Sequence, residues 1–148
     1  MCVIVDTNIA DRVLLKHDDP DFSDVNVALK SGKVTLVYGD KLAKEYSGNQ
    51  AVRKFVVSLA RAGIAHRVRE SLIDAELNWL EEQGGCESND RHIIALARAS
   101  GARILCSNDG ALGRDFNNIA LINKPKGKIY KNSEHKHLLK IPCRLQRQ

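Results

Sequence analysis

Residues 88–109 have the sequence SNDRHIIALARASGARILCSND, and this stretch decides the fold class. Its first half places apolar residues at helical spacing through Ile93–Ala97, and Gly101 is typical of a helix end. The apolar run at residues 103–106 then has the length of a buried strand, and Asp109 follows it closely. A helix that leads directly into a buried strand is typical of α/β proteins with a parallel sheet.

The rest of the chain alternates in the same way. Cys2–Val5 is continuously apolar, as in a strand that helices cover on both faces. We therefore expect a central parallel sheet flanked by helices. Further strands are predicted at residues 34–38 and 119–122, and helices at residues 24–30, 40–46, 50–62, 70–83 and 89–100, with Ser23 and Ser88 as N-caps of the first and last helix.

The composition is that of an ordinary globular protein. At 148 residues the chain fits a single domain that can form a hydrophobic core without disulfides. Apolar residues make up 43% and charged residues 28%, which excludes disordered and fibrous classes. The apolar runs fall far short of the roughly 20 residues of a membrane helix, and Met1 leads into a strand without a signal-peptide pattern. These features predict a cytoplasmic protein with no membrane partner.

Positive charge is concentrated near the C-terminus. Residues 124–148 contain eight Lys or Arg and one Glu, whereas residues 1–123 contain 15 Lys or Arg and 17 Asp or Glu. A basic segment of this kind attracts phosphate backbones, which an acidic site alone would repel. A solvated tail that aids solubility would have the same composition. We expect this segment to form a loop or an extended arm that either contacts phosphate or stays in solvent.

The four cysteines, at positions 2, 86, 106 and 143, show no CxxC spacing. They indicate neither a redox motif nor a zinc ribbon, and we expect reduced, mostly buried thiols. The alternative is a zinc site that uses Cys143, His135 and His137, although a fourth ligand at a typical spacing is missing from the sequence.

Two aspartates follow apolar strands. Asp6 comes directly after Cys2–Val5, and Asp109 comes shortly after the strand at residues 103–106. Because ligands of α/β sheets bind at the carboxyl ends of parallel strands, both are candidates for one site. An aspartate that begins a turn or caps the next helix would occupy the same positions.

Two more acids lie on predicted helices. Asp90 heads the apolar face that continues through Ile93 and Ala97, so its carboxylate is expected to face inward. A favourable charge in the first helical turn would explain its position but not that direction. Glu45 lies on the Leu42 side of a short helix after the second strand, where by itself it would be taken for a surface glutamate.

Four carboxylates that converge on one edge of a sheet would raise one another's pKa unless a cation compensated their charge. Oxygen ligands without nearby Cys or His are typical of Mg²⁺ or Mn²⁺ sites, in which the ion keeps some waters and binds phosphate. Such an ion can orient and activate water for attack on phosphorus. The four acids therefore predict a site for Mg²⁺ or Mn²⁺ that acts on phosphate esters.

Three segments of the chain resemble the acidic motifs of PIN-domain nucleases. VIVDTN at residues 3–8 resembles the first strand of that family, SNDRHIIALA at residues 88–97 its third motif, and ILCSND at residues 104–109 its fourth. The order and spacing match as well. The resemblance covers about residues 1–123, and Glu45 falls where the family's second acid is expected, with Asp40 and Glu70 as alternatives.

The resemblance implies a PIN-like three-layer α/β/α domain over residues 1–123, followed by a basic extension over residues 124–148. It implies an Mg²⁺- or Mn²⁺-dependent endoribonuclease whose catalytic metal ligands are Asp6, Glu45, Asp90 and Asp109. Weaker candidates for contacts with phosphate or water are Thr7, Asn8, Ser107 and Asp115, to which the charge pattern adds Lys124, Lys126 and Lys128.

The implied partners are RNA, with single-stranded or flapped DNA ranked second, a second copy of the chain, and an antitoxin or other protein inhibitor. An antitoxin is implied because the family includes VapC-like toxins of toxin–antitoxin pairs.

Other classes fit less well. A haloacid dehalogenase-type phosphatase needs a second Asp two residues after the first, where this chain has Asn8. A receiver domain would show paired acids before its first helix, and a flap nuclease would need domain elements that this length cannot contain. A non-catalytic PIN-like module that binds RNA or protein is the remaining alternative.

Overall fold

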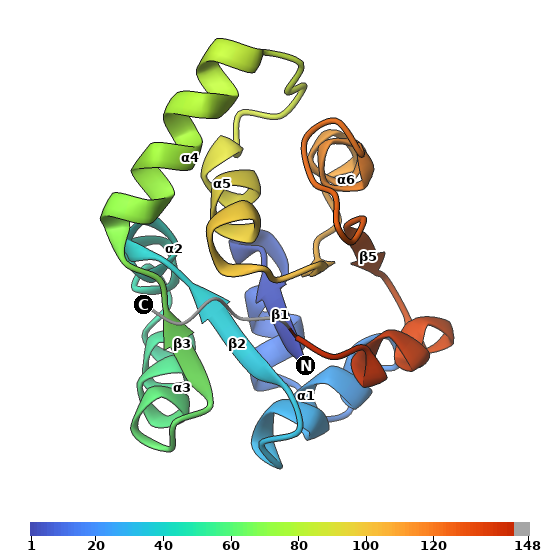
Figure 1. The fold of residues 1–148 in the computed structure, drawn as a ribbon. Helices are drawn as coiled ribbons and strands as arrows, with labels where there is room; N and C mark the ends of the chain where they lie inside the picture. Colours follow the sequence, from blue (N-terminus) through green and yellow to red (C-terminus); the bar gives the residue numbers. More distant parts are fainter. Residues whose placement is uncertain (144–148) are drawn as a thin grey trace.

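The computed structural model describes residues 1–143 and contains a five-stranded sheet in which neighbouring strands are all parallel (Figure 1). The strand order is β3-β2-β1-β4-β5, so β1 lies at the centre. Because the strands run in one direction, their carboxyl ends meet at one edge of the sheet, here named the carboxyl edge, opposite the amino edge. The strands are β1 (Cys2–Val5), β2 (Thr35–Tyr38), β3 (Ala65–Arg67), β4 (Ile104–Cys106) and β5 (Lys128–Tyr130).

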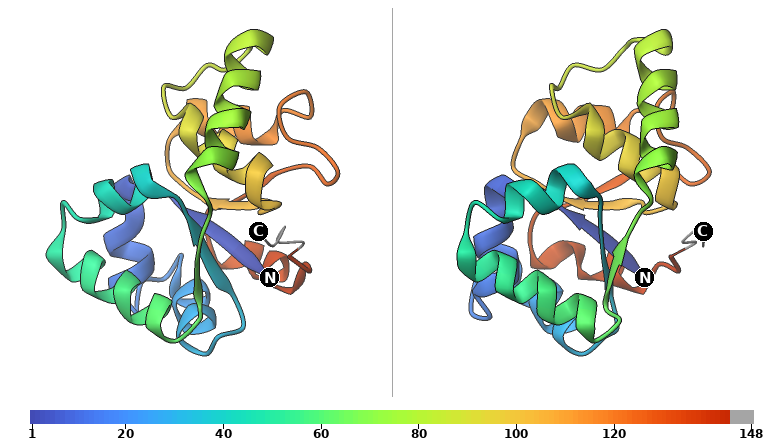
Figure 2. Two further views of the ribbon diagram at one scale, coloured as in Figure 1. Left: turned by 60° about the vertical axis from the view of Figure 1, so that its left-hand side comes forward. Right: turned by 90° about the vertical axis from the view of Figure 1, so that its left-hand side faces the viewer.

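Helices cover both faces of the sheet, which confirms the predicted fold class of three layers around a parallel sheet. Figure 2 shows α4, α5 and α6 on one side of the sheet and α1 and α3 on the other. Within residues 1–143, no helix has the length and apolar character needed to cross a lipid bilayer. The helices, with η for those of 3₁₀ or π type, are η1 (Thr7–Ile9), η2 (Asp11–Leu15), α1 (Ser23–Lys30), α2 (Asp40–Tyr46), α3 (Gln50–Arg61), α4 (Glu70–Gln83), α5 (Arg91–Ser100), α6 (Gly110–Asn117) and η3 (Ser133–Lys140).

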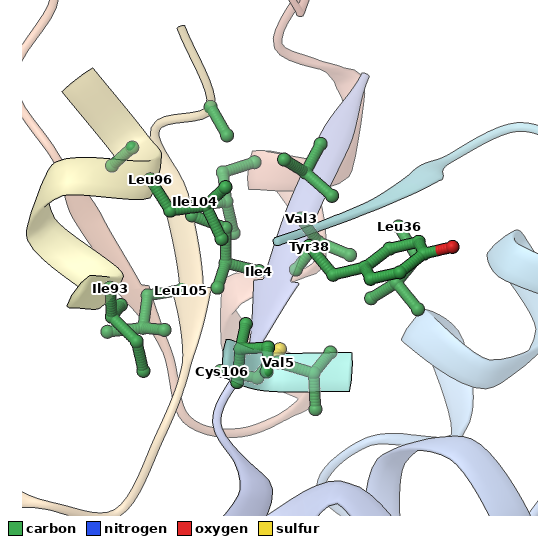
Figure 3. Packing of buried hydrophobic residues seen from close by; sticks show 14 of the residues in the cluster. Val3, Ile4, Val5, Leu36, Tyr38, Ile93, Leu96, Ile104, Leu105 and Cys106 are labelled. Carbon is green, nitrogen blue, oxygen red and sulfur yellow. The ribbon is translucent and has the colours of Figure 1, made fainter. Parts of the chain in front are cut away.

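The core is built around β1 and α5. All four residues of β1 are buried, as expected for a central strand of a parallel sheet. Eight of the ten α5 residues are also buried. Figure 3 shows Ile93 and Leu96 of α5 beside Ile104 and Leu105 of β4. The stretch with the strongest pattern in the sequence therefore forms a buried helix and a buried strand that pack against each other.

The predicted helix ends are partly right. α5 stops at Ser100, and Gly101 adopts a left-handed φ of 86°, as predicted for a helix-ending glycine. The two predicted serine N-caps are wrong. Ser23 is the first residue of α1, and Ser88 lies in the turn before α5, where its hydroxyl accepts the backbone N–H of Asp90 at 2.9 Å.

The C-terminal part of the sheet also differs from the prediction. Residues 119–122 form turns instead of a strand, and Ile119 is 61% exposed. The last strand is β5, which lies inside the segment that was expected to be a loop or an arm, so the sheet continues past residue 123. Strand β3 was missed as well. Both missed strands are edge strands of three residues, too short to show a periodic pattern.

The prediction of four reduced thiols is wrong for one pair. Cys2 and Cys143 form a disulfide, with Cα atoms 5.3 Å apart, whereas Cys86 and Cys106 are free. A separation of 141 residues hides this pairing in the sequence. Because its sulfur is bonded to Cys2, Cys143 is not available as a zinc ligand. The zinc alternative therefore fails, because it loses one of its three candidate ligands to the disulfide.

Candidate active site

Asp6 is a buried carboxylate at the carboxyl end of β1, with 6% of its surface exposed. Its backbone N–H donates to the carbonyl of Cys106 at 2.9 Å, which extends the pairing of β1 with β4. Burial raises the pKa of Asp6 above its ordinary range. A hydrogen bond from Ser107 lowers this pKa, and the charges of Asp90 and Asp109 raise it further. The structure therefore brings three of the four predicted acids within electrostatic reach of one another.

Ser107 links two of these acids through one hydroxyl group. Its Oγ donates to Asp6 Oδ2 at 2.7 Å and accepts the backbone N–H of Asp109 at 3.0 Å. The single hydroxyl proton of Ser107 is thus used by Asp6, and the side chain acts as a positioning group between β1 and β4.

Asp109 is the N-cap of α6. Its Oδ1 accepts the backbone N–H of Leu112 at 3.1 Å. Asp109 therefore does cap the next helix, which was the alternative to a role in the site. This role does not remove its charge from the site, because Asp109 still raises the pKa of Asp6.

Asp90 is placed at the start of α5 by a buried aspartate behind it. Asp115 is only 2% exposed, and its two carboxylate oxygens accept the backbone N–H groups of Glu87 and Ser88, each at 2.9 Å. Ser88 then accepts the N–H of Asp90. Asp115 therefore anchors the loop that carries Asp90, and both of its oxygens are occupied by that task. Asp90 itself is half-buried and makes no side-chain capping bond.

Glu45 is held against the end of β1 by two hydrogen bonds. The hydroxyl of buried Tyr46 donates to the carbonyl of Val5 at 2.5 Å and so fixes the end of α2 against the end of β1. The hydroxyl of Thr7, the residue after Asp6, donates to Glu45 Oε1 at 3.0 Å. Burial raises the pKa of the Tyr46 hydroxyl, and the charge of Asp6 raises it further.

His92 is a buried neighbour of this site that the sequence analysis missed. It is 7% exposed, and its Nε2 lies 3.5 Å from Glu45 Oε1, at the outer limit of a hydrogen bond. Burial lowers the pKa of His92, and the charge of Glu45 opposes that shift. Its position two residues after Asp90, on a helix buried on most sides, was the available signal.

The two alternatives to Glu45 have other surroundings. Asp40 pairs with Arg67 at the end of β3. Glu70 begins α4 and lines a small pocket together with His92.

The three predicted lysines lie away from the acids. Lys124 lines a pocket with Cys2 at the amino edge, Lys126 lies in the turn after it, and Lys128 begins β5. Asn8, also a predicted contact residue, is exposed, and its backbone N–H bonds the Asp6 carboxylate.

The donor set is suited to a hard dication, although the ligands are not preassembled. The side-chain donors nearest Asp6 are carboxylate and hydroxyl oxygens, which are the ligands of Mg²⁺ and Mn²⁺. Asp6 is buried beside two like charges, a conflict that a dication would relieve. Across residues 1–143, however, no three such side chains are close enough together to form a ready-made metal group.

Comparisons with known proteins give one distant structural likeness. No family model and no curated protein matches the chain. The crystal structure of VapBC2 from Rickettsia felis bound to a DNA fragment from their promoter is 18% identical, with a TM-score of 0.42. The alignment covers 87% of this chain and 97% of that one. A likeness of this size carries no argument about activity.

Proposed function

We propose that this chain is an Mg²⁺- or Mn²⁺-dependent endoribonuclease whose metal is held by Asp6, Asp90, Asp109 and Glu45. The observation that carries the proposal is Asp6, a buried carboxylate at the end of a central parallel strand, whose pKa is raised by burial and by two acids from other segments. An isolated buried charge is costly, and proteins keep such groups mainly where they are used.

The protein groups and the metal would have separate tasks. A bound dication would supply charge neutralisation at the phosphate and activation of a water molecule. Asp6, Asp90 and Asp109 would provide oxygen ligands from the ends of β1, α5 and β4. Thr7 holds the Glu45 carboxylate in place, and Ser107 holds Asp6 relative to Asp109.

The test is the sequencing of RNA ends produced by the purified protein with Mn²⁺. Asp6→Asn should abolish these ends while the fold is retained, because the variant loses a charged ligand but keeps the shape of the side chain. Asp74→Asn is the matched control, since Asp74 is exposed on α4. Equal cleavage by wild type and Asp6→Asn would refute the proposal.

A role as the toxin of a toxin–antitoxin pair is the finer form of the proposal, and it is drawn from the resemblance alone. It predicts that induced expression in a bacterial host stops growth, that Asp6→Asn expression does not, and that a co-expressed inhibitor protein copurifies with the chain. Undisturbed growth during strong expression of the wild type would remove this role.

The second candidate function is a non-catalytic module that binds RNA. The absence of a preassembled metal group among residues 1–143 favours it. Isothermal titration calorimetry separates the two functions, because the nuclease must bind Mg²⁺ or Mn²⁺ and the module must not. RNA binding without any metal binding would replace the nuclease proposal with this one.

A further inference from the structure

A pocket of about 460 Å³ lies at the carboxyl edge, beside the acids. We name it the flanking pocket. Asp109 forms part of its wall, so it adjoins the candidate active site on the β5 side. Its other polar residues come from the ends of β4 and β5, from α6 and from η3, and they include Asn108, Arg114, Lys131 and His135.

Arg114 brings a guanidinium group into this pocket. Its Nε donates to Glu87 Oε2 at 2.9 Å, which restrains the side chain. A Cβ at Gly110 would approach Arg114 Nη1 to 3.4 Å, so the small residue leaves space for the guanidinium beside Asp109. Among residues 1–143, the terminal nitrogens of Arg114 have no hydrogen-bond partner. A guanidinium with free terminal donors matches the geometry of a phosphate group.

His135 adds a donor whose tautomer is set by the backbone. Its Nδ1 accepts the N–H of Lys131 at 3.0 Å, so in the neutral ring the proton is on Nε2. The ring also contacts Tyr130 edge-on, with centroids 6.0 Å apart. The imidazole is therefore held as an N–H donor in the wall of the flanking pocket.

Lys131 lies at the carboxyl edge because it comes directly after the carboxyl end of β5. Lys128 begins the same strand, and each strand residue advances the chain by about 3.3 Å, so these two lysines lie at opposite edges of the sheet. Of this pair, Lys131 supplies the positive charge at the carboxyl edge. Charge counting along the sequence could not separate the two, because the strand between them was not predicted.

We propose that the flanking pocket binds a phosphate of the RNA strand next to the phosphate that is cleaved. The inference depends on the proposed function, because the acids define which phosphate is cleaved. The strand would cross the carboxyl edge from β1 over β4 to β5, with the cleaved phosphate above the acids. Arg114, Lys131 and His135 would then offset the repulsion that the acids exert on the backbone.

The test measures RNA binding in the Asp6→Asn background, where the substrate stays intact. A fluorescent single-stranded RNA is titrated at several salt concentrations with the parent and with Arg114→Gln and Lys131→Gln. Lys33→Gln is the matched control, since Lys33 is an exposed lysine before β2 at the amino edge. Point variants are preferable to removal of residues 124–148, which would delete β5 from the sheet.

Each pocket variant should weaken binding by about fivefold, and each should lower the slope of log K against log salt by up to about 0.7, the value for complete loss of one phosphate contact of a single strand. The control should change neither. In a wild-type Asp6 background with Mn²⁺, Arg114→Gln should raise KM and leave kcat nearly unchanged, as expected for a contact made equally in the ground and transition states. Arg114→Lys should recover only part of the affinity, because it restores charge without the planar fork.

The outcomes separate the two proposals. Parent-like affinity and salt slope in both pocket variants, with circular dichroism showing a native fold, would overturn the flanking pocket as a phosphate site. An equal loss in Lys33→Gln would overturn it too, because the attraction would then be diffuse. Absence of RNA cleavage by the wild type would instead refute the nuclease proposal, whatever the binding data show.

Discussion

At the scale of single residues, the carboxylate of Asp6 lies where burial and two acidic neighbours disfavour its charge. Because its pKa is raised in the folded protein, the group favours folding at low pH, and this contribution is lost as the pH rises through the folded pKa. Without metal at pH 7, Asp6→Asn should therefore raise the melting temperature, by about 2–4 °C for each kcal/mol gained. Differential scanning calorimetry measures this shift.

The pH dependence provides the control for that prediction. At a pH below the unfolded pKa, Asp6 is protonated in both states, so the difference between wild type and Asp6→Asn should vanish. Asp74→Asn, on the exposed side of α4, should show no gain at either pH. A lower melting temperature for Asp6→Asn at pH 7 would contradict the assignment of Asp6 as a strained, functional carboxylate.

Tyr46 is the residue on which the position of Glu45 depends. Tyr46→Phe removes the hydroxyl that donates to the buried carbonyl of Val5 and should lower the free energy of unfolding by about 1–3 kcal/mol. RNA cleavage should fall as well, because α2 also carries Glu45. Tyr38→Phe is the control, since that hydroxyl has no hydrogen-bond partner within residues 1–143. Chemical denaturation that gives Tyr46→Phe and Tyr38→Phe the same free energy of unfolding would show that the Tyr46 hydrogen bond does not hold α2 against β1.

At the scale of elements, the attachment of β5 to the sheet depends on Gly127. A Cβ at this position would overlap the carbonyl oxygen and the ring of Phe116 at the end of α6. Gly127→Ala should therefore cost about 1–3 kcal/mol of stability by overpacking. Gly113→Ala within α6 should have the opposite sign, by up to about 1 kcal/mol, because its nearest contact would be Ile129 at 3.8 Å and alanine favours helix. Urea denaturation of both variants checks the pair.

How far the sequence predicts these elements depends on their burial. The α5–β4 pair and β1 were predictable because continuous burial leaves a continuous apolar pattern. The edge strands β3 and β5 were not, since three residues of mixed polarity carry no period. Their pairing is decided by neighbouring strands, which are distant in the sequence.

For the candidate site too, local sequence patterns predict some residues, whereas other contacts are visible only in the folded structure. Asp6 and Asp109 were found because each comes after a recognisable strand. The bridging role of Ser107, the anchoring role of Asp115 and the closeness of His92 to Glu45 depend on side chains from separate segments. No local pattern encodes such contacts, so only the folded structure could reveal them.

At the scale of the whole molecule, the Cys2–Cys143 disulfide closes almost the entire chain into a loop. Cys143→Ser should lower the free energy of unfolding by about 2–4 kcal/mol, because the cross-link restricts the unfolded chain. Cys86→Ser is the control, as Cys86 is a free thiol. Equal stability of wild type and Cys143→Ser without reductant would exclude the bond. Since disulfides are rare in cytosolic proteins, the thiol state in cells also tests the predicted cytoplasmic location.

The same bond has a practical consequence for handling the protein. It joins the start of β1 to residue 143 at the amino edge, while the acids lie at the carboxyl edge. A linker placed before Met1 would tether the molecule to a sensor chip with its candidate active site turned toward the flowing RNA. Immobilisation through the amino edge therefore leaves the carboxyl edge, with the candidate active site, open to solution.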